Sequence, residues 1–312
     1  MPTTEATDTL LDCLVVGAGP AGLTAATYLA RYRRTVTVID GGRSRARWIP
    51  ASHNCPGFPF GVAGNELLQR FRAQAQEFGV AIVPAQVQML SREGGHFVAR
   101  GDGQRWHARQ VILATGVVDR LPDMDDVEQA IACGALRLCA VCDGYEARDD
   151  AICVLGATDT AVGHAEFLRT FSGRVTVLGN AADVPADEAL HLRAEAAGIA
   201  LRGVPARLQL RDRGCQVTFA DGSVEHYDTL YPVLGADAQS GLAQALGARI
   251  DDGGELQVDI RMQTSVEGLY AIGDVVSGLN QISVAVGHAA LAATAVHRSL
   301  PPNPRERAHG PS

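Results

Sequence analysis

The chain has 312 residues, of which 46% are hydrophobic and 20% charged, and its formal net charge is −8 at pH 7. This length predicts one large domain or two of ordinary size, and a composition with 34 glycines is typical of a compact α/β enzyme rather than a fibrous or disordered chain. The negative charge argues against nucleic-acid binding, no apolar run is long enough to span a bilayer, and scattered cysteines favour a reducing cytoplasm.

The chain opens with the pattern of a strand, a helix and a second strand, at residues 12–19, 20–34 and 35–40. The same order recurs at residues 151–180. We therefore expect an α/β protein with two Rossmann-like nucleotide-binding folds. The simplest layout is a split domain of residues 1–118 and 243–312 with a second domain, residues 119–242, inserted into it and joined by two hinge linkers.

The first strand–helix turn has the G-x-G-x-x-G spacing, with Gly17, Gly19 and Gly22. Gly17 permits the tight turn, Gly19 lets the backbone approach a pyrophosphate, and Gly22 allows close helix packing. Asp40 ends the next strand, where a carboxylate accepts hydrogen bonds from ribose hydroxyls and disfavours a 2′-phosphate. A later strand, LYAIGD, ends in Gly273 and Asp274 and favours a longer cofactor, FAD, over NAD.

Residues 138–146, LCAVCDGYE, contain Cys139 and Cys142 at C-x-x-C spacing, followed directly by Asp143. Two such thiols can close a redox-active disulfide, and the adjacent carboxyl group can give a proton to the leaving thiolate. Half of a zinc site is the main alternative, but no second Cys or His pair has suitable spacing. We therefore expect no metal.

The other cysteines stand singly. Cys13, Cys153 and Cys215 lie in expected strands and are interpreted as buried packing residues. Cys55 precedes a Pro-Gly turn, and we leave open whether it packs in a loop or serves as an auxiliary thiol near the flavin.

The order of these motifs resembles the low-molecular-weight thioredoxin reductases over nearly the whole chain. The resemblance rests on GAGPAGLTAA, NCPGFPFGVAGNELLQRFRAQAQEFG, VILATG, CAVCDGYE, GLYAIGDV and NQISVAVGHAALAA. It implies a homodimeric flavoprotein whose inserted domain rotates to present either a nicotinamide or the C-x-x-C to FAD. It also suggests that Cys142 faces the flavin and that Cys139 exchanges with the substrate.

The resemblance further assigns residues around FAD. The pyrophosphate would be held by Gly17, Gly19, Pro20, Ala21 and Gly22, the adenosine would lie near Asp40 and Gly41, and its adenine near Val87. The flavin ring would lie near Asn54, Asn280, Gln281 and Ile282. The cofactor would also be lined by Thr115, Gly116 and Gly273, and its ribityl side held by Asp274.

The inserted domain departs from this family at its nicotinamide site. Thr158 replaces the second glycine of its turn, and no Lys or Arg occurs between Arg174 and Arg193, where the family grips a 2′-phosphate. Such a phosphate would instead meet the carboxylates of Asp183, Asp187 and Glu188. NADPH binding is therefore doubtful.

The leading hypothesis is an FAD-dependent dithiol–disulfide oxidoreductase that acts on a thioredoxin-like protein or a small dithiol without NADPH as donor. Its electrons would come from a protein such as ferredoxin, or it would run in reverse as a dithiol oxidase that passes electrons to O2. A conventional NADPH-dependent thioredoxin reductase stays open. So does a non-catalytic redox-sensing flavoprotein, although a sensor does not need the proton donor Asp143.

Overall fold

The computed structural model of the chain describes residues 9–180, 188–276 and 278–305 and divides into two compact units. The first comprises Met1–Ala46, Glu66–Val117 and Ala238–Ser312, and the second comprises Arg47–Asn65 and Val118–Asp237. The segment 47–65, which the sequence analysis assigned to the first domain, groups with the second unit. There the side chain of Trp48 packs against the buried cluster that contains Leu136 and Leu230.

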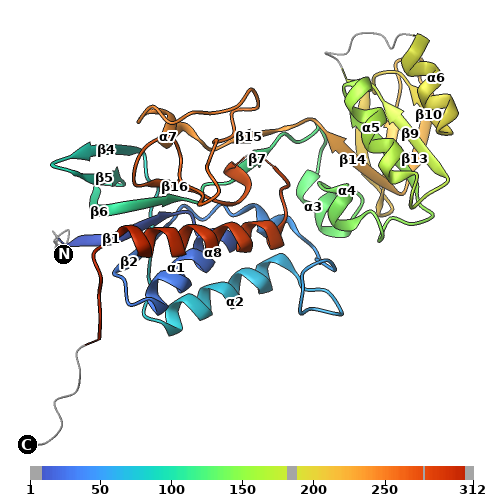
Figure 1. The fold of residues 1–312 in the computed structure, drawn as a ribbon. Helices are drawn as coiled ribbons and strands as arrows, with labels where there is room; N and C mark the ends of the chain where they lie inside the picture. Colours follow the sequence, from blue (N-terminus) through green and yellow to red (C-terminus); the bar gives the residue numbers. More distant parts are fainter. Residues whose placement is uncertain (1–8, 181–187, 277, 306–312) are drawn as a thin grey trace, which may run out of the picture. The chain divides into compact units, whose positions relative to one another are not determined.

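The first unit is built on one large sheet (Figure 1). Its strands run in the order β3-β2-β1-β6-β5-β4, and β16 pairs in parallel with the C-terminal half of β6. Its elements are β1 (Leu10–Val16), α1 (Pro20–Arg31), β2 (Val36–Asp40), the 3-10 helix η1 (Arg45–Trp48), which runs on into the second unit, α2 (Gly64–Glu77), β3 (Ala81–Pro84), β4 (Met89–Glu93), β5 (His96–Gly101), β6 (Gln104–Leu113), α7 (Gly241–Gln244), β16 (Leu269–Ala271), the 3-10 helix η2 (Gly273–Val275) and α8 (Ile282–Ser299).

The second unit contains a parallel sheet in the order β10-β9-β8-β14 and an antiparallel sheet in the order β11-β12-β13. Its elements are α3 (Val127–Cys133), α4 (Ala140–Asp143), β8 (Ala151–Gly156), α5 (Thr158–Leu168), β9 (Arg174–Leu178), α6 (Glu188–Ala196), β10 (Ile199–Arg202), β11 (Arg207–Arg211), β12 (Gly214–Thr218), β13 (Val224–Tyr227) and β14 (Thr229–Val233). The two chain segments that connect the units pair with each other as β7 (Val117–Asp119) and β15 (Ala236–Ala238).

The parallel strands β1 and β8 are buried on both faces of their sheets, and this explains their continuous apolar runs. Successive side chains of a strand point to opposite faces. Cys13 and Val15 therefore pack with α1 and α8, while Leu14 and Val16 pack in the cluster on the other face. In the second unit, Ile152 and Val154 face α5 in the same way. The structure confirms the expected α/β class with two Rossmann-like folds.

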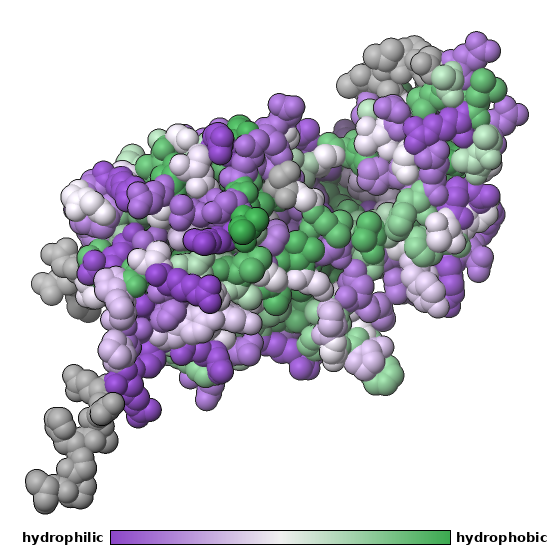
Figure 2. Space-filling view, viewed as in Figure 1, coloured by the Kyte–Doolittle hydropathy of each residue, from purple (hydrophilic) through white to green (hydrophobic). Residues whose placement is uncertain are grey.

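Within the described residues, no helix combines the length and the apolar character needed to cross a bilayer. On the face drawn in Figure 2, hydrophilic and apolar residues are interspersed over each unit.

Candidate active site

The turn between β1 and α1 has the close packing that its three glycines predict. Gly17 has a φ of 111°, and a Cβ there would lie 2.2 Å from the carbonyl oxygen of Ala114. A Cβ on Gly22 would lie 1.9 Å from the carbonyl oxygen of Gly17. At Gly19, by contrast, the nearest atom to an added Cβ is Ser44 Oγ at 3.4 Å. Of the three glycines, Gly19 is therefore the one whose Cβ side is not closed by backbone atoms of the protein, which leaves room for a ligand to approach the main chain there.

This turn fits the pyrophosphate of FAD. Helix α1 begins at Pro20 and carries no acidic side chain in its first turn, so its N-terminal N–H groups favour an anion. Ala21, the next residue, lies close to η2, since a Cβ added to Gly273 would be 3.0 Å from Ala21 Cβ. The Gly-rich turn and the Gly-Asp turn, which are about 250 residues apart in sequence, are thus neighbours in the first unit.

The residues expected near the adenosine lie where β2 ends. Asp40 Oδ1 accepts a hydrogen bond from Gly42 N at 2.8 Å, and its Oδ2 accepts one from Arg72. A Cβ on Gly41 would lie 2.7 Å from Gln86 Oε1, and Val87 is buried. Arg72, which the sequence analysis did not single out, comes from α2 and holds Asp40 in place.

The expected residues after β6 connect two chain segments of the first unit. Thr115 Oγ1 donates to the carbonyl oxygen of Gln239 at 2.7 Å, and Gln239 N donates to the carbonyl oxygen of Gly116 at 2.9 Å. Gly116 has a φ of 67°, a conformation that favours glycine. Whether Thr115 and Gly116 also contact the cofactor stays a prediction.

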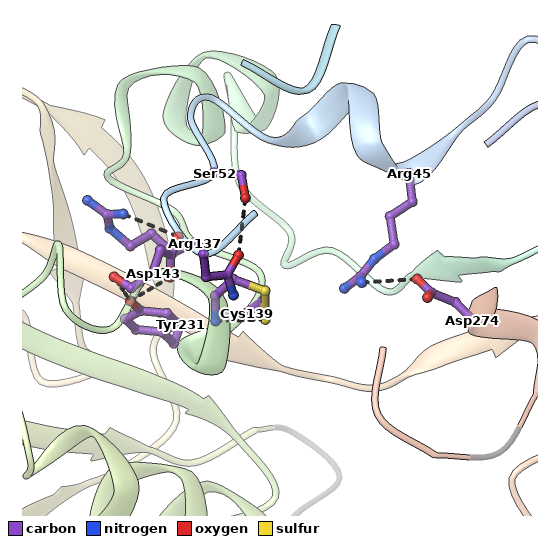
Figure 3. Close-up of a disulfide and its surroundings, with 9 residues drawn as sticks. Arg45, Ser52, Arg137, Cys139, Asp143, Tyr231 and Asp274 are labelled. Atoms are coloured by element: carbon purple, nitrogen blue, oxygen red, sulfur yellow. Dashed lines mark hydrogen bonds and ion pairs between the residues drawn. A yellow bond between two sulfur atoms is a disulfide. The ribbon is translucent and has the colours of Figure 1, made fainter. Parts of the chain in front are cut away.

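Asp274 lies in η2, and its Oδ2 pairs with Arg45 Nη1 at 3.4 Å (Figure 3). Asn280 and Gln281 directly precede α8, which begins at Ile282 with Gln281 as its N-cap. These residues lie in the first unit with the Gly-rich turn, and their contacts with FAD stay predictions.

His288 on α8 was not predicted from any sequence motif. Its Nδ1 is buried and has no hydrogen-bond partner within the described part of the chain. Burial lowers the pKa of this imidazole, and the carboxylate of Asp274 opposes that shift. An unsatisfied buried nitrogen that interacts electrostatically with Asp274 fits a polar ligand near η2 and α8. The sequence gave little signal, since His288 is one of two histidines in an alanine-rich helix.

Cys139 and Cys142 form a disulfide with a Cα–Cα distance of 5.3 Å. Cys139 is the N-cap of the short helix α4, and Cys142 N donates to its Sγ at 3.2 Å. Val141, which lies between the two cysteines on α4, is 51% exposed. The surface at this helix is therefore accessible to a protein or small-molecule substrate. The structure therefore joins the two cysteines that the C-x-x-C spacing paired.

Asp143 is the last residue of α4, and the structure surrounds its carboxylate with two donors. Tyr231 Oη donates to Oδ1 at 2.9 Å, and Arg137 Nη1 donates to Oδ2 at 3.2 Å (Figure 3). Burial raises the pKa of Asp143, and the positive charge of Arg137 opposes this effect. A partly buried carboxyl group with a raised pKa, directly after a disulfide cysteine in the chain, is suited to proton transfer.

The nucleotide turn of the second unit differs from the first. Helix α5 begins at Thr158 itself, one residue after the N-cap Ala157, and Gly156 lacks the positive φ of Gly17. Of the three acidic residues expected to repel a 2′-phosphate, Glu188 is exposed at the start of α6, while Asp183 and Asp187 lie outside the described residues. A branched side chain thus stands where the first turn exposes bare backbone.

Asn54 lies in the segment that groups with the second unit, and its Oδ1 accepts a hydrogen bond from Ser52 Oγ at 3.1 Å. Its expected place near the flavin ring stays a prediction. Cys55 beside it is buried, and burial raises the pKa of its thiol. The single cysteines Cys13, Cys153 and Cys215 are also buried, as expected of packing residues.

A Gly-rich turn next to a Gly-Asp turn, together with a disulfide and a partly buried carboxyl group, indicates an FAD-dependent disulfide oxidoreductase. Residues 11–289 match the family described as pyridine nucleotide-disulphide oxidoreductase. The chain belongs to this family. Several proteins that resemble the chain over nearly their full length are thioredoxin reductases.

The thioredoxin reductase of Peptoclostridium acidaminophilum is 28% identical over 95% of this chain and 99% of its own length. The crystal structure of thioredoxin reductase from Streptococcus pyogenes MGAS5005 has a TM-score of 0.85 and 29% identity, covering 94% of this chain and 98% of that one. The crystal structure of HlmI has a TM-score of 0.87 and 29% identity, covering 95% of this chain and 94% of that one. The expected thioredoxin reductase-like enzyme class is thus confirmed.

Proposed function

We propose that this enzyme passes two electrons between FAD, the Cys139–Cys142 disulfide and an external thiol or disulfide, without NADPH as the donor. FAD, when bound, supplies or accepts the electron pair. The substrate is a thioredoxin-like protein or a small dithiol, and Asp143 exchanges the proton. We further propose a homodimer in the cytoplasm.

The exchange step follows from the chemistry of the disulfide. A thiolate of the external dithiol attacks one sulfur of the Cys139–Cys142 bond and forms a mixed disulfide. The S–S bond breaks, its electron pair stays on the other cysteine sulfur, and that thiolate takes up a proton from Asp143. The second thiol of the substrate then attacks the mixed disulfide and leaves as a disulfide, so the substrate is oxidised and the cysteine pair is reduced. The opposite direction uses the same steps in reverse.

One observation carries the exclusion of NADPH, namely the altered turn at Thr158. Thr158 is the first residue of helix α5 and occupies the position of the second glycine of the motif. A pyrophosphate needs to approach the backbone closely at that position. The stretch after β9 adds to this, because residues 175–192 contain no Lys or Arg to pair with a 2′-phosphate. Both changes affect the same ligand and leave the disulfide unaffected.

The names of the relatives favour the second candidate, a conventional NADPH-dependent thioredoxin reductase. The two candidates differ in what reduces the flavin. The anaerobic holoenzyme should keep its flavin absorption band with NADPH and lose it with a small dithiol such as dithiothreitol or with a reduced protein donor. Cys139→Ser serves as the matched control, since it should block bleaching by the dithiol. Rapid bleaching by NADPH would establish the conventional enzyme instead.

The dithiol and the protein donor separate the remaining candidates. If O2 restores the band after bleaching by the dithiol, the enzyme is a dithiol oxidase. If only a reduced ferredoxin bleaches the band, the enzyme is a donor-dependent reductase. If NADPH, the dithiol and the protein donor all fail to reduce the flavin, the protein is a non-catalytic redox sensor.

A further inference from the structure

The carboxylate of Asp143 is held from two different parts of the second unit. Tyr231 lies in the middle of β14, where it is paired in register with Val154 of β8, and it is only 2% exposed. Its hydroxyl lies 2.9 Å from Asp143 Oδ1 and 3.3 Å from the main-chain oxygen of the same residue. One hydroxyl group therefore has two acceptors on one residue.

Arg137 approaches the other carboxylate oxygen. It lies two residues before Cys139, its side chain is 19% exposed, and its Nη1 is 3.2 Å from Asp143 Oδ2. Its backbone is fixed, because Arg137 N donates to the carbonyl oxygen of Leu230 at 2.9 Å. Its Nε is buried without a partner within the described part of the chain, so the guanidinium is oriented toward Asp143 at the expense of one of its own hydrogen bonds.

These two contacts differ in what they allow chemically. Arg137 has donors and no acceptor, so a proton on Oδ2 would find no acceptor on the guanidinium, and the ion pair favours protonation at Oδ1. A tyrosine hydroxyl can both donate and accept. When Oδ1 is protonated, Tyr231 can accept from it and turn its own proton toward the main-chain oxygen of Asp143.

We propose that Arg137 and Tyr231 are positioning residues for proton transfer at the disulfide: Arg137 holds Oδ2, and Tyr231 lets Oδ1 take up and release the proton by turning its hydroxyl. The proposal rests on the proposed function of Asp143 in thiol–disulfide exchange. When the Cys139–Cys142 bond breaks, the electron pair remains on the leaving sulfur, and the Oδ1 proton moves to that thiolate. Reoxidation returns the proton to Oδ1.

The charged groups around Asp143 set the direction of the expected pH effect. Burial raises the pKa of its carboxyl group, and the Glu146 carboxylate adds a smaller upward shift. The Arg137 charge and the Tyr231 hydrogen bond lower this pKa, with Arg137 as the larger cause. Burial and the Asp143 carboxylate raise the pKa of Tyr231 itself, so its hydroxyl stays protonated at neutral pH. Loss of either donor should therefore move the ionisation of Asp143 to higher pH.

The test follows the reduction of the disulfide in the holoenzyme by dithiothreitol under anaerobic conditions between pH 5 and pH 9. Samples are quenched with an alkylating reagent, and the modified cysteine pair is quantified by mass, which is independent of the flavin. Each rate is divided by the rate of the Asp143→Asn variant at the same pH. This ratio removes the pH dependence that comes from ionisation of the attacking dithiothreitol thiol, since both proteins share it. The resulting ratio falls where Asp143 loses its proton.

Tyr231→Phe keeps the ring in the core and removes only the hydroxyl. Its midpoint should shift to higher pH by about one unit, and the midpoint of Arg137→Met by more, within the roughly one to three units typical of a neighbouring opposite charge. Arg137→Lys should recover part of that shift. In the Asp143→Asn background, Tyr231→Phe should have no further effect, since the two residues act through one carboxyl group.

Tyr227→Phe is the matched control. Tyr227 is also buried in the second unit, but its hydroxyl donates to Glu225. Its profile should coincide with that of the wild type. The proposal is overturned if the Tyr231→Phe profile also coincides with the wild type, or if the wild-type disulfide does not open at all. A shifted profile in a protein whose flavin is bleached neither by a thiol nor by a reduced protein donor would support the positioning role and contradict the proposed function.

Discussion

Two alanine substitutions in the β1–α1 turn should separate the fold of the turn from its ligand. A methyl group at Gly22 would lie 1.9 Å from the carbonyl oxygen of Gly17, which is a backbone atom and cannot turn away. A methyl group at Gly19 would lie 3.4 Å from Ser44 Oγ, and Gly19 has a φ of −79°, which alanine adopts readily. We therefore expect Gly22→Ala to destabilise the fold and Gly19→Ala to weaken only the binding of the cofactor.

The magnitudes follow from these distances. To relieve the clash at Gly22, helix α1 must move by about 1 Å against a close-packed sheet, and such overpacking costs about 1–3 kcal/mol. Alanine recovers about 1 kcal/mol of helix propensity, which leaves a net loss of up to about 2 kcal/mol. Gly19→Ala should change the stability of the apoprotein by less than about 0.5 kcal/mol. Its methyl group should nevertheless weaken FAD binding by about tenfold or more, since tenfold corresponds to only about 1.4 kcal/mol.

The assay compares thermal unfolding of the apoprotein and titration of the apoprotein with FAD, followed by the quenching of flavin fluorescence. Gly22→Ala should lower the melting temperature without ligand by several degrees, at about 2–4 °C per kcal/mol. Gly19→Ala should melt like the wild type without FAD and should gain less stability when FAD is added. If Gly19→Ala binds FAD as tightly as the wild type, the pyrophosphate does not bind at this turn.

Two further predictions concern the cysteines. Cys139→Ser and Cys142→Ser should each abolish disulfide exchange but retain FAD. The flavin-to-protein absorbance ratio measures the bound FAD. Loss of FAD in either variant would contradict the placement of the cysteine pair outside the cofactor turn. After reduction of the native protein at pH 8, iodoacetamide should label Cys139 and Cys142 and leave Cys13 and Cys153 unmodified, because burial raises the pKa of both latter thiols. Peptide mass spectrometry monitors the labelling of each cysteine. Rapid labelling of Cys13 would show that β1 is not buried in the core as described.

The sequence predicted those features whose geometry depends on local spacing. The G-x-G-x-x-G pattern specifies a turn within six residues, and the structure has the close contacts of Gly17 and Gly22 that this turn requires. The C-x-x-C spacing likewise brings Cys139 and Cys142 within bonding distance in a single turn of chain. In such cases neighbours in sequence are neighbours in space.

The environment of Asp143 could not be predicted, because it depends on contacts between distant residues. Tyr231 is 88 residues further along the chain and meets Asp143 only because β14 pairs with β8. The grouping of segment 47–65 with the second unit depends on the packing of Trp48, which no local pattern indicates. His288 was missed for a related reason, since a histidine within an apolar helix gives no sign of whether its ring nitrogen finds a partner.

Gly156 shows why a remaining glycine does not by itself indicate a nucleotide site. A Cβ at Gly156 would lie 2.7 Å from the carbonyl oxygen of Val233, so this position must stay glycine for β8 to pair with β14. The same strand pair places Tyr231 against Asp143. Selection for proton transfer at the disulfide would therefore preserve β8, β14 and Gly156 even if no nicotinamide bound. Thr158 lies outside that strand pairing, so a substitution at this position would leave the pairing of β8 with β14 intact.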